Sequence, residues 1–248
     1  MARQIIFALA LILTLGIFAF TVKKLAGYFS FTGPAFAVRD IRKRLILTLK
    51  VAFGQTKIFR RPVLGLLHAL VFWGFCLILF GSIEMVIDGL AGTERSLHVL
   101  GGFYDFMIAS GDVFAVIVAL SIIVFLVRRL FLHVPRFEGI EMKKRSHVDA
   151  GSALTLILLL MVSLLTMNTG YVGEMAAKGE PVYGIFPASA FLAGALGGLS
   201  ENGFHILHEI SWWSHILLIF FFANYLPYSK HFHVFMSVPN VFLSRLDP

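Results

Sequence analysis

The chain has 248 residues, of which 58% are hydrophobic and 14% charged, and it contains a single cysteine, Cys76. This apolar composition excludes an ordinary soluble domain, and one cysteine excludes an internal disulfide or an iron–sulfur cluster held by four thiolates of the chain. The net charge of +7 comes mostly from loops beside apolar segments, so it indicates membrane topology, and no nucleic-acid partner is expected.

Five apolar segments reach or approach the length of about 20 residues needed to cross a bilayer. The predicted spans are residues 4–22, 63–90, 104–131, 150–172 and 205–229. The first span has no small-residue cleavage site before Lys23, so we expect it to be retained rather than cleaved as a signal peptide. These features predict an all-α membrane protein, a five-transmembrane-helix bundle that forms a single domain over residues 1–248.

The basic residues indicate the orientation of the bundle. Residues 23–61 hold ten Lys and Arg against one acid, Asp40, and residues 128–147 hold six more. Short loops rich in Lys and Arg stay in the cytoplasm. We therefore expect a multi-pass protein of the cytoplasmic (inner) membrane, with the N-terminus outside and the C-terminus inside. The basic connector 23–61 is expected to lie on lipid headgroups or to receive a soluble partner.

The second span begins at Pro62, a favoured residue in the first turn of a helix, and carries His68 less than two turns inside. An unpaired imidazole at this depth is costly, and an ionisable residue within a span by default indicates a functional site. His68 is therefore a candidate ligand, and a hydrogen-bonded packing residue is the alternative.

The outer segments offer weaker candidates. His98 lies in the loop after the second span, where a solvated histidine is the alternative to a functional one. The third span carries Asp112, and the fourth carries small hydroxyl residues and Asn168, which commonly serve helix packing. Residues 173–203 include an apolar run too short to cross the membrane, which predicts a re-entrant or interfacial element that would wall a quinone pocket.

The last apolar segment carries five of the nine histidines, which are His205, His208, His215, His231 and His233. Haem b needs two axial donors on different helices that face each other across the macrocycle. Since the second span runs outward and the fifth inward, His68 and His233 share the cytoplasmic level and form the best-matched pair of ligands to haem iron. His231 is the alternative to His233. His215 precedes His233 by 18 residues, or about 27 Å along a helix, so it cannot bind the same haem iron.

The segment HILLIFFFANYLPYSKHFHV resembles the last helix of the respiratory nitrate reductase gamma-subunit family, five-helix proteins with two haems b. In that family a helical His is followed 18 residues later by another in a P-[FY]-S-[KR]-x-x-H context, which His215 and residues 227–233 match. His68, in GLLHALVFWGF, matches the inner-side ligand of the second helix. The resemblance covers nearly the whole chain and is strongest for haem b membrane domains fused to, or partnered with, heterodisulfide-reductase-like iron–sulfur proteins.

One position departs from the family pattern. The family has a fourth ligand ten residues after the first on the second helix, and that residue is Ile78 here, which cannot bind iron. The resemblance thus implies His215 as a ligand to the iron of a second haem that lacks its usual partner, with Met85 or His98 as candidate substitutes. His208, two turns before His215, is expected to shape a quinone pocket, and His98 is a second candidate there. One haem b is expected, and a second is left open.

These features predict a membrane-bound cytochrome b, the electron-transfer subunit of a quinone-linked oxidoreductase. It would pass electrons between the quinone pool, menaquinone or a similar quinone, and a cytosolic iron–sulfur protein or fused domain. The alternatives are a transporter or structural membrane anchor without haem, and a histidine-box di-metal membrane oxidase. The latter would use His205-x-x-His208 and His231-x-His233, which the predicted topology places on opposite sides of the membrane.

Overall fold

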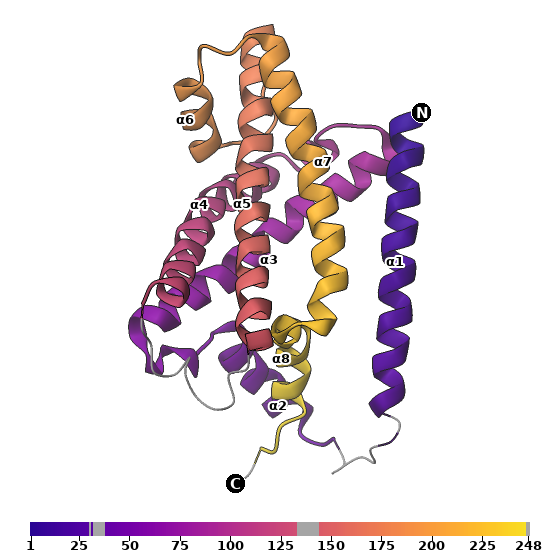
Figure 1. Cartoon of the computed structure of the whole chain (residues 1–248), viewed down its shortest axis with the longest axis vertical. Coiled ribbons are helices and arrows are strands. Elements are labelled where there is room, and N and C mark those ends of the chain that lie inside the picture. The colour runs from indigo at the N-terminus through magenta and orange to yellow at the C-terminus, as the bar shows by residue number, and fades with distance from the viewer. Residues whose placement is uncertain (30, 32–37, 133–143, 247–248) are drawn as a thin grey trace.

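The computed structural model describes residues 1–246, apart from residue 30, residues 32–37 and residues 133–143, and so leaves out His133 and most of the second basic loop. The described residues form helices and no strand, and five helices are long and apolar enough to cross a membrane (Figure 1). They are α1 (Ala2–Phe29), α3 (Pro62–Ala91), α4 (Gly102–Leu130), α5 (Lys144–Lys178) and α7 (Glu201–Tyr225). The all-α class is confirmed, and each of the five predicted segments lies largely in a helix long and apolar enough to cross a membrane, although α1 and α5 extend well beyond residues 4–22 and 150–172.

The two ends of the bundle carry different short elements. The upper end, as drawn in Figure 1, holds the start of α1, the connection between α3 and α4, and the short helix α6 (Pro187–Ala195). The lower end holds α2 (Ile41–Thr48), a π-helical turn over Leu49–Phe53, and α8 (His233–Phe242). The apolar run predicted as a re-entrant or interfacial element therefore contains a short helix beside the upper end.

Helices α5 and α7 run against each other at very short range because glycines line their contact. A Cβ atom on Gly170 would lie 2.5 Å from the backbone nitrogen of His208, and one on Gly173 would lie 2.3 Å from the ring of Phe204. Small residues allow this close approach of backbones between membrane helices. The first turn of α7 thus lies directly against α5, and this contact positions the histidines of α7.

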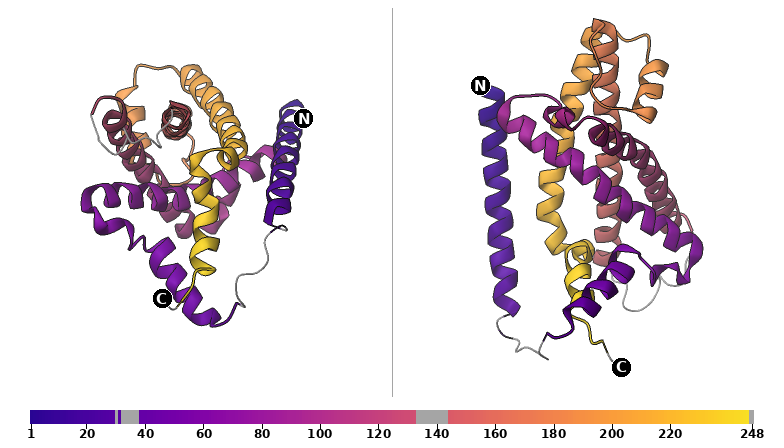
Figure 2. Two further views of the ribbon diagram at one scale, coloured as in Figure 1. Left: turned by 60° about the horizontal axis from the view of Figure 1, so that its bottom comes forward. Right: turned by 180° about the vertical axis from the view of Figure 1, so that it is seen from behind.

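Helix α1 stands at the side of the bundle (Figure 2) and contacts it at several points along its length, from Phe7 near its start to Thr21, whose hydroxyl oxygen lies 3.0 Å from that of Tyr228. Phe7 is fully buried, and its ring centroid lies 5.7 Å from that of Trp212 and 5.9 Å from that of Phe220. Further along α1, Ile12 and Phe20 are 67% and 69% exposed. Exposing such large apolar side chains to water is unfavourable in free energy, so the outer face of α1 is suited to contact lipid.

The last apolar segment is two helices rather than one. Helix α7 ends at Tyr225, two 3₁₀ turns follow over Leu226–Tyr228 and Lys230–Phe232, and α8 begins at His233. Pro227 lacks an N–H group and cannot continue the α-helical hydrogen bonding. The separation of about 27 Å predicted for His215 and His233 assumes one continuous helix between them. His233 instead lies on a separate helix that leaves the axis of α7.

Arg44 is a structural residue of the lower end and not part of its exposed basic surface. Its side chain is buried and donates hydrogen bonds to the carbonyl oxygens of Arg39 (2.7 Å), Phe242 (2.8 Å) and Ser244 (2.7 Å). Phe242 is the last residue of α8, where free carbonyl groups attract cationic side chains. Arg44 therefore fastens α2 to the end of α8.

Replacing Arg44 with alanine is expected to lower the free energy of unfolding by about 3 kcal/mol. A hydrogen bond to a charged group contributes about 1.5–3 kcal/mol, and the three carbonyl groups would lose their donor together. The measurement is denaturant unfolding of the detergent-solubilised protein followed by circular dichroism. The control is Arg42→Ala on the exposed face of the same helix, which should change stability by no more than about 0.5 kcal/mol. Equal stability of the two variants would contradict the structural role.

Candidate functional site

Two histidines come close together at the lower end. His68 lies near the start of α3 and His233 begins α8, and their ring centroids are 6.3 Å apart with ring planes tilted by 34°. An imidazole nitrogen lies about 2 Å from a bound transition metal, so two imidazoles on opposite sides of one metal have ring centroids about 6 Å apart. The separation of His68 and His233 fits two axial ligands of one iron.

The surroundings of these rings leave buried nitrogen atoms without partners. The Nδ1 atoms of His68 and His231 are buried and have no hydrogen-bond partner among the described residues. Nearly all buried polar atoms in native proteins are paired. His231 lies with its ring centroid 5.8 Å from that of His233. Burial, together with the charge of His233, lowers the pKa of His231 to about 4, so its ring is neutral at physiological pH. The lower end thus holds two imidazoles, those of His68 and His231, whose Nδ1 atoms have no hydrogen-bond partner in the part of the chain that the structure describes.

Within the described ranges, no three His, Cys, Asp or Glu side chains gather so that they could hold a metal ion. A haem iron needs two ligands from the protein, and His68 and His233 are two side chains of the required type that lie close together. The pairs proposed for a di-metal centre do not meet, because His205 and His208 begin α7 whereas His231 and His233 follow its end.

His215 lies in the middle of α7 and is 1% exposed. Its Nδ1 atom is 2.9 Å from the hydroxyl oxygen of Ser163 on α5. With Ile78 and Met85, it borders a cavity of about 40 Å³, little more than the volume of one water molecule. Of the two substitutes considered for a second haem ligand, the structure therefore brings Met85 to His215, whereas His98 does not border this cavity.

A larger cavity of about 340 Å³, here called the upper cavity, lies at the upper end. This volume falls in the range of about 300–1,000 Å³ that is usual for small-molecule sites. Trp212, Met85 and Met167 form an apolar part of its wall. The rest of the wall is largely charged and includes Arg3, Glu84, Asp88, Glu94, Arg95, Glu174, Lys178, His205, His208 and Glu209.

Of the two histidines predicted to line a quinone pocket, His208 lies in the wall of the upper cavity. It is 6% exposed, its Nδ1 atom lies 3.0 Å from the carbonyl oxygen of Met167, and its Nε2 atom lies 3.3 Å from Oε1 of Glu94. The hydrogen bond with His208 lowers the pKa of Glu94, against the effect of burial. A buried imidazole and a carboxylate thus meet at the cavity surface.

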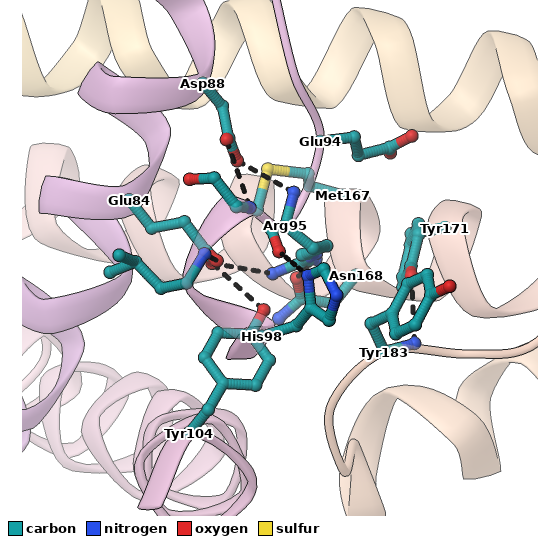
Figure 3. Close-up of polar contacts among 12 residues, drawn as sticks. Glu84, Asp88, Glu94, Arg95, His98, Tyr104, Met167, Asn168, Tyr171 and Tyr183 are labelled. Carbon is teal, nitrogen blue, oxygen red and sulfur yellow. Dashed lines mark hydrogen bonds and ion pairs between the residues drawn. The ribbon is translucent and has the colours of Figure 1, made fainter. Parts of the chain in front are cut away.

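Of the other two elements predicted for this pocket, His98 lies elsewhere and the segment 173–203 reaches the cavity only with its first residues. The Nδ1 atom of His98 is 2.7 Å from the carbonyl oxygen of Arg95, and its ring packs against Tyr183 with centroids 4.4 Å apart (Figure 3). His98 does not border the upper cavity. Of the predicted segment 173–203, Glu174 and Lys178 at the end of α5 border the cavity, whereas residues 179–203 contribute no side chain to its wall. The predicted lid is therefore displaced from this cavity, because Asp112 of α4 holds α6 instead.

A buried polar cluster around Arg95 supports the wall and was not predicted from the sequence (Figure 3). The Arg95 guanidinium donates to Oδ1 of Asn168 at 2.9 Å, lies 3.7 Å from Oε2 of Glu84, and sits 4.7 Å from the ring centroid of Tyr171. Tyr104 also donates its hydroxyl hydrogen to Glu84, at 3.1 Å. The loop after α3 is thereby fixed to α4 and α5. One feature of the sequence indicates this cluster: Glu84 and Asp88 lie one helical turn apart, and an arginine follows them in the next loop.

Two further carboxylates fasten the upper segments to the bundle. Asp88 accepts hydrogen bonds from the backbone N–H groups of Arg95 (2.8 Å) and Ser96 (3.2 Å). Asp112, 1% exposed on α4, accepts from the N–H groups of Ala188 (2.7 Å) and Ser189 (3.0 Å) and from the Ser189 hydroxyl. A carboxylate at the start of a helix satisfies its free N–H groups. Asp112 therefore holds the first turn of α6.

Two curated proteins are similar to this chain. It is 26% identical over 249 aligned positions to the "Probable iron-sulfur-binding oxidoreductase FadF" of Bacillus subtilis (strain 168), covering 99% of this chain and 33% of that protein. It is 26% identical over 238 positions to the "EtfAB:quinone oxidoreductase" of Syntrophomonas wolfei, covering 91% of this chain and 31% of that protein. The chain thus spans about a third of the length of these oxidoreductases. No family model and no solved structure matches it.

Proposed function

We propose that the chain is a membrane-bound cytochrome b that transfers electrons between a quinone and an iron–sulfur partner, either a separate protein or a domain of the same protein. The observation that carries this proposal is the pair of imidazoles at the lower end. His68 and His233 come from two different helices, and their ring centroids are 6.3 Å apart, which suits two axial ligands of a single iron. The printed names of the two relatives, an iron–sulfur-binding oxidoreductase and a quinone oxidoreductase, support the two redox partners.

The chain's own residues set the conditions for such a cofactor. His68 and His233 would hold haem b, and the apolar interior of the bundle would exclude water from it. When bound, the haem supplies reversible one-electron transfer at iron, with a potential tuned by its ligands and surroundings. His231 would lie beside the site as the alternative ligand, and His215 would remain a second ligand position further up α7. The proposal commits to one haem per chain.

The exposed basic residues of the lower end support a docking place for the iron–sulfur partner. Arg42, Lys43, Lys50, Lys57, Arg60 and Arg61 are exposed there, and Arg44 is not. Lysine and arginine in short loops favour the cytoplasmic side, so we propose that the lower end faces the cytoplasm and the upper end the outside. Electrons would then pass between the lower end and a cytosolic partner attracted by this basic surface. The quinone would bind in the upper cavity, beside His208.

The experiment that tests the proposal is a reduced-minus-oxidised optical spectrum of the purified chain, with the haem quantified as its pyridine haemochrome. The expected result is a b-type spectrum and one haem per chain, because the His68 and His233 rings at the lower end have centroids 6.3 Å apart. A transporter or structural anchor would give no haem band, and this result would remove the proposal. Two haems per chain would instead assign a second ligand set that includes His215.

A further inference from the structure

The upper cavity contains two side chains whose contact requires a shared proton. The Nδ1 atom of His208 lies 3.0 Å from the carbonyl oxygen of Met167. A carbonyl oxygen can only accept a hydrogen bond, so Nδ1 carries a hydrogen. In the neutral ring the opposite nitrogen, Nε2, then carries none and is the basic atom of the imidazole. The backbone of α5 thereby fixes which nitrogen of His208 faces the cavity as a base.

Glu94 lies against this basic nitrogen, with Oε1 3.3 Å from Nε2. A carboxylate and an unprotonated ring nitrogen are both acceptors, so their hydrogen bond needs one proton, held by the ring or by the carboxyl group. The hydrogen bond with His208 lowers the pKa of Glu94, which favours the carboxylate form of Glu94. The Glu94 side chain is 55% exposed and the His208 side chain only 7%. The pair therefore connects the buried wall of the cavity with water.

The other charged groups of the cavity wall are already matched with one another. They pair as Arg3 with Glu209 (2.8 Å), Arg95 with Glu84 (3.7 Å), Lys178 and His205 with Glu174 (2.6 and 3.0 Å), and Asp88 with the N–H groups of Arg95 and Ser96. In the first two pairs a permanent cation balances the acid. In the third, Lys178 already supplies the positive charge, and His205 is half-exposed, with 52% of its side chain accessible. None of these groups needs an additional proton to satisfy its contact.

We propose that His208 and Glu94 form a proton-transfer pair for a quinone bound in the upper cavity, an inference that rests on the proposed function. Reduction of a quinone to the hydroquinone takes up two electrons, supplied by the electron-transfer path, and two protons. One proton leaves Nε2 of the His208 imidazolium, where an N–H bond breaks, and an O–H bond forms on a quinone oxygen. The second proton comes from water at the mouth of the cavity. Glu94 then relays a proton from water to His208, and hydroquinone oxidation runs through the same steps in reverse.

The variants that test this pair are His208→Gln and Glu94→Gln. The control is His98→Gln, which changes a histidine at the same end of the bundle that does not border the cavity and should leave turnover unchanged. Quinone-linked turnover is measured for the native complex in membranes with a short-chain naphthoquinone. A positioned acid or base typically contributes at least about 100-fold to rate. We expect His208→Gln to lower kcat by about this factor and Glu94→Gln by about tenfold, with KM within about twofold. Glu94 lies in an exposed loop, so its variant remains informative if His208→Gln fails to accumulate. Added imidazole should restore part of the rate of His208→Ala.

A separate binding measurement distinguishes failure of this inference from failure of the proposed function. Naphthoquinone should quench the tryptophan fluorescence of the purified chain, and Trp212→Phe should remove most of the quenching because Trp212 borders the cavity. If the native complex turns over but this quenching is absent, the quinone binds elsewhere and the pair has no such role. Unchanged kcat in both Gln variants, or a rise in KM alone, would also overturn the inference. Absence of quinone-linked turnover in the native complex would instead remove the proposed function.

Discussion

Replacing His68 with alanine is expected to remove the b-type haem absorption from the purified protein. His68 is one of two donors at the lower end, and the ring centroid of His233 lies 6.3 Å from its own. Loss of a residue that only supports a metal ligand already weakens a site about 10- to 100-fold, so loss of the ligand itself should cost at least as much. The pyridine haemochrome of detergent-purified protein should therefore fall from one haem per chain to a small fraction of that value. His233→Ala should give the same result.

Two histidine variants make the loss specific. His98→Ala changes a histidine at the upper end that bonds to the Arg95 carbonyl group, and it should retain full haem. The ring of His233 lies beside that of His68, whereas the ring of His231 packs against that of His233. His231→Ala therefore tests which of the two neighbouring candidates, His231 or His233, binds the iron. Circular dichroism checks that each variant is folded. Full haem content in both His68→Ala and His233→Ala would show that these imidazoles do not bind the iron.

The level at which His68 and His233 meet could be predicted because it depends on few physical quantities. The rise of a helix, the thickness of the bilayer and the alternation of direction between spans place two residues at the same depth without any knowledge of packing. The number and type of the spans follow from composition in the same way. The ring separation, in contrast, depends on the turn after Tyr225, which starts α8 at His233. Pro227 indicates that the helix is interrupted, but it does not give the new direction of the chain.

The upper cavity could not be assembled from the sequence because its contacts join residues far apart in the chain. Arg95 bonds to Asn168, 73 positions later, and Asp112 holds the start of α6, 76 positions later. Local periodicity carries no information about such pairings, which arise from helix packing. Arg95 lies in the loop after α3, yet it is only 8% exposed. The apolar run within residues 173–203 predicts a pocket wall from its composition, but of that segment Glu174 and Lys178 border the cavity and the apolar run does not. The actual wall is largely charged and comes from the ends of four helices and a loop.

Replacing Arg95 with alanine is expected to be among the most destabilising single changes in the chain. Arg95 is buried between Glu84 and Asn168 and lies 4.7 Å from the ring centroid of Tyr171. Removal of one partner of a buried ion pair leaves an uncompensated charge, here on Glu84, and typically costs about 3–5 kcal/mol. Denaturant unfolding of the detergent-solubilised protein, followed by circular dichroism, should show a loss of this size. Since the backbone of Arg95 also carries the loop bonds to Asp88, a side-chain change leaves that anchor in place and tests the charge itself.

A matched pair of further variants separates the charge from the packing. Arg3→Ala breaks the ion pair between Arg3 and Glu209. The Arg3 side chain is 47% exposed and the Glu209 side chain 29%, and surface ion pairs contribute no more than about 1 kcal/mol to stability. Combining Arg95→Ala with Glu84→Gln should recover part of the lost stability, because the acid no longer needs a cation and Tyr104 can still bond to the amide oxygen. If Arg95→Ala alone were as mild as Arg3→Ala, Glu84 would have to be neutral in the folded protein. The Arg95 guanidinium would then hold the loop only through Asn168 and the neighbouring aromatic rings.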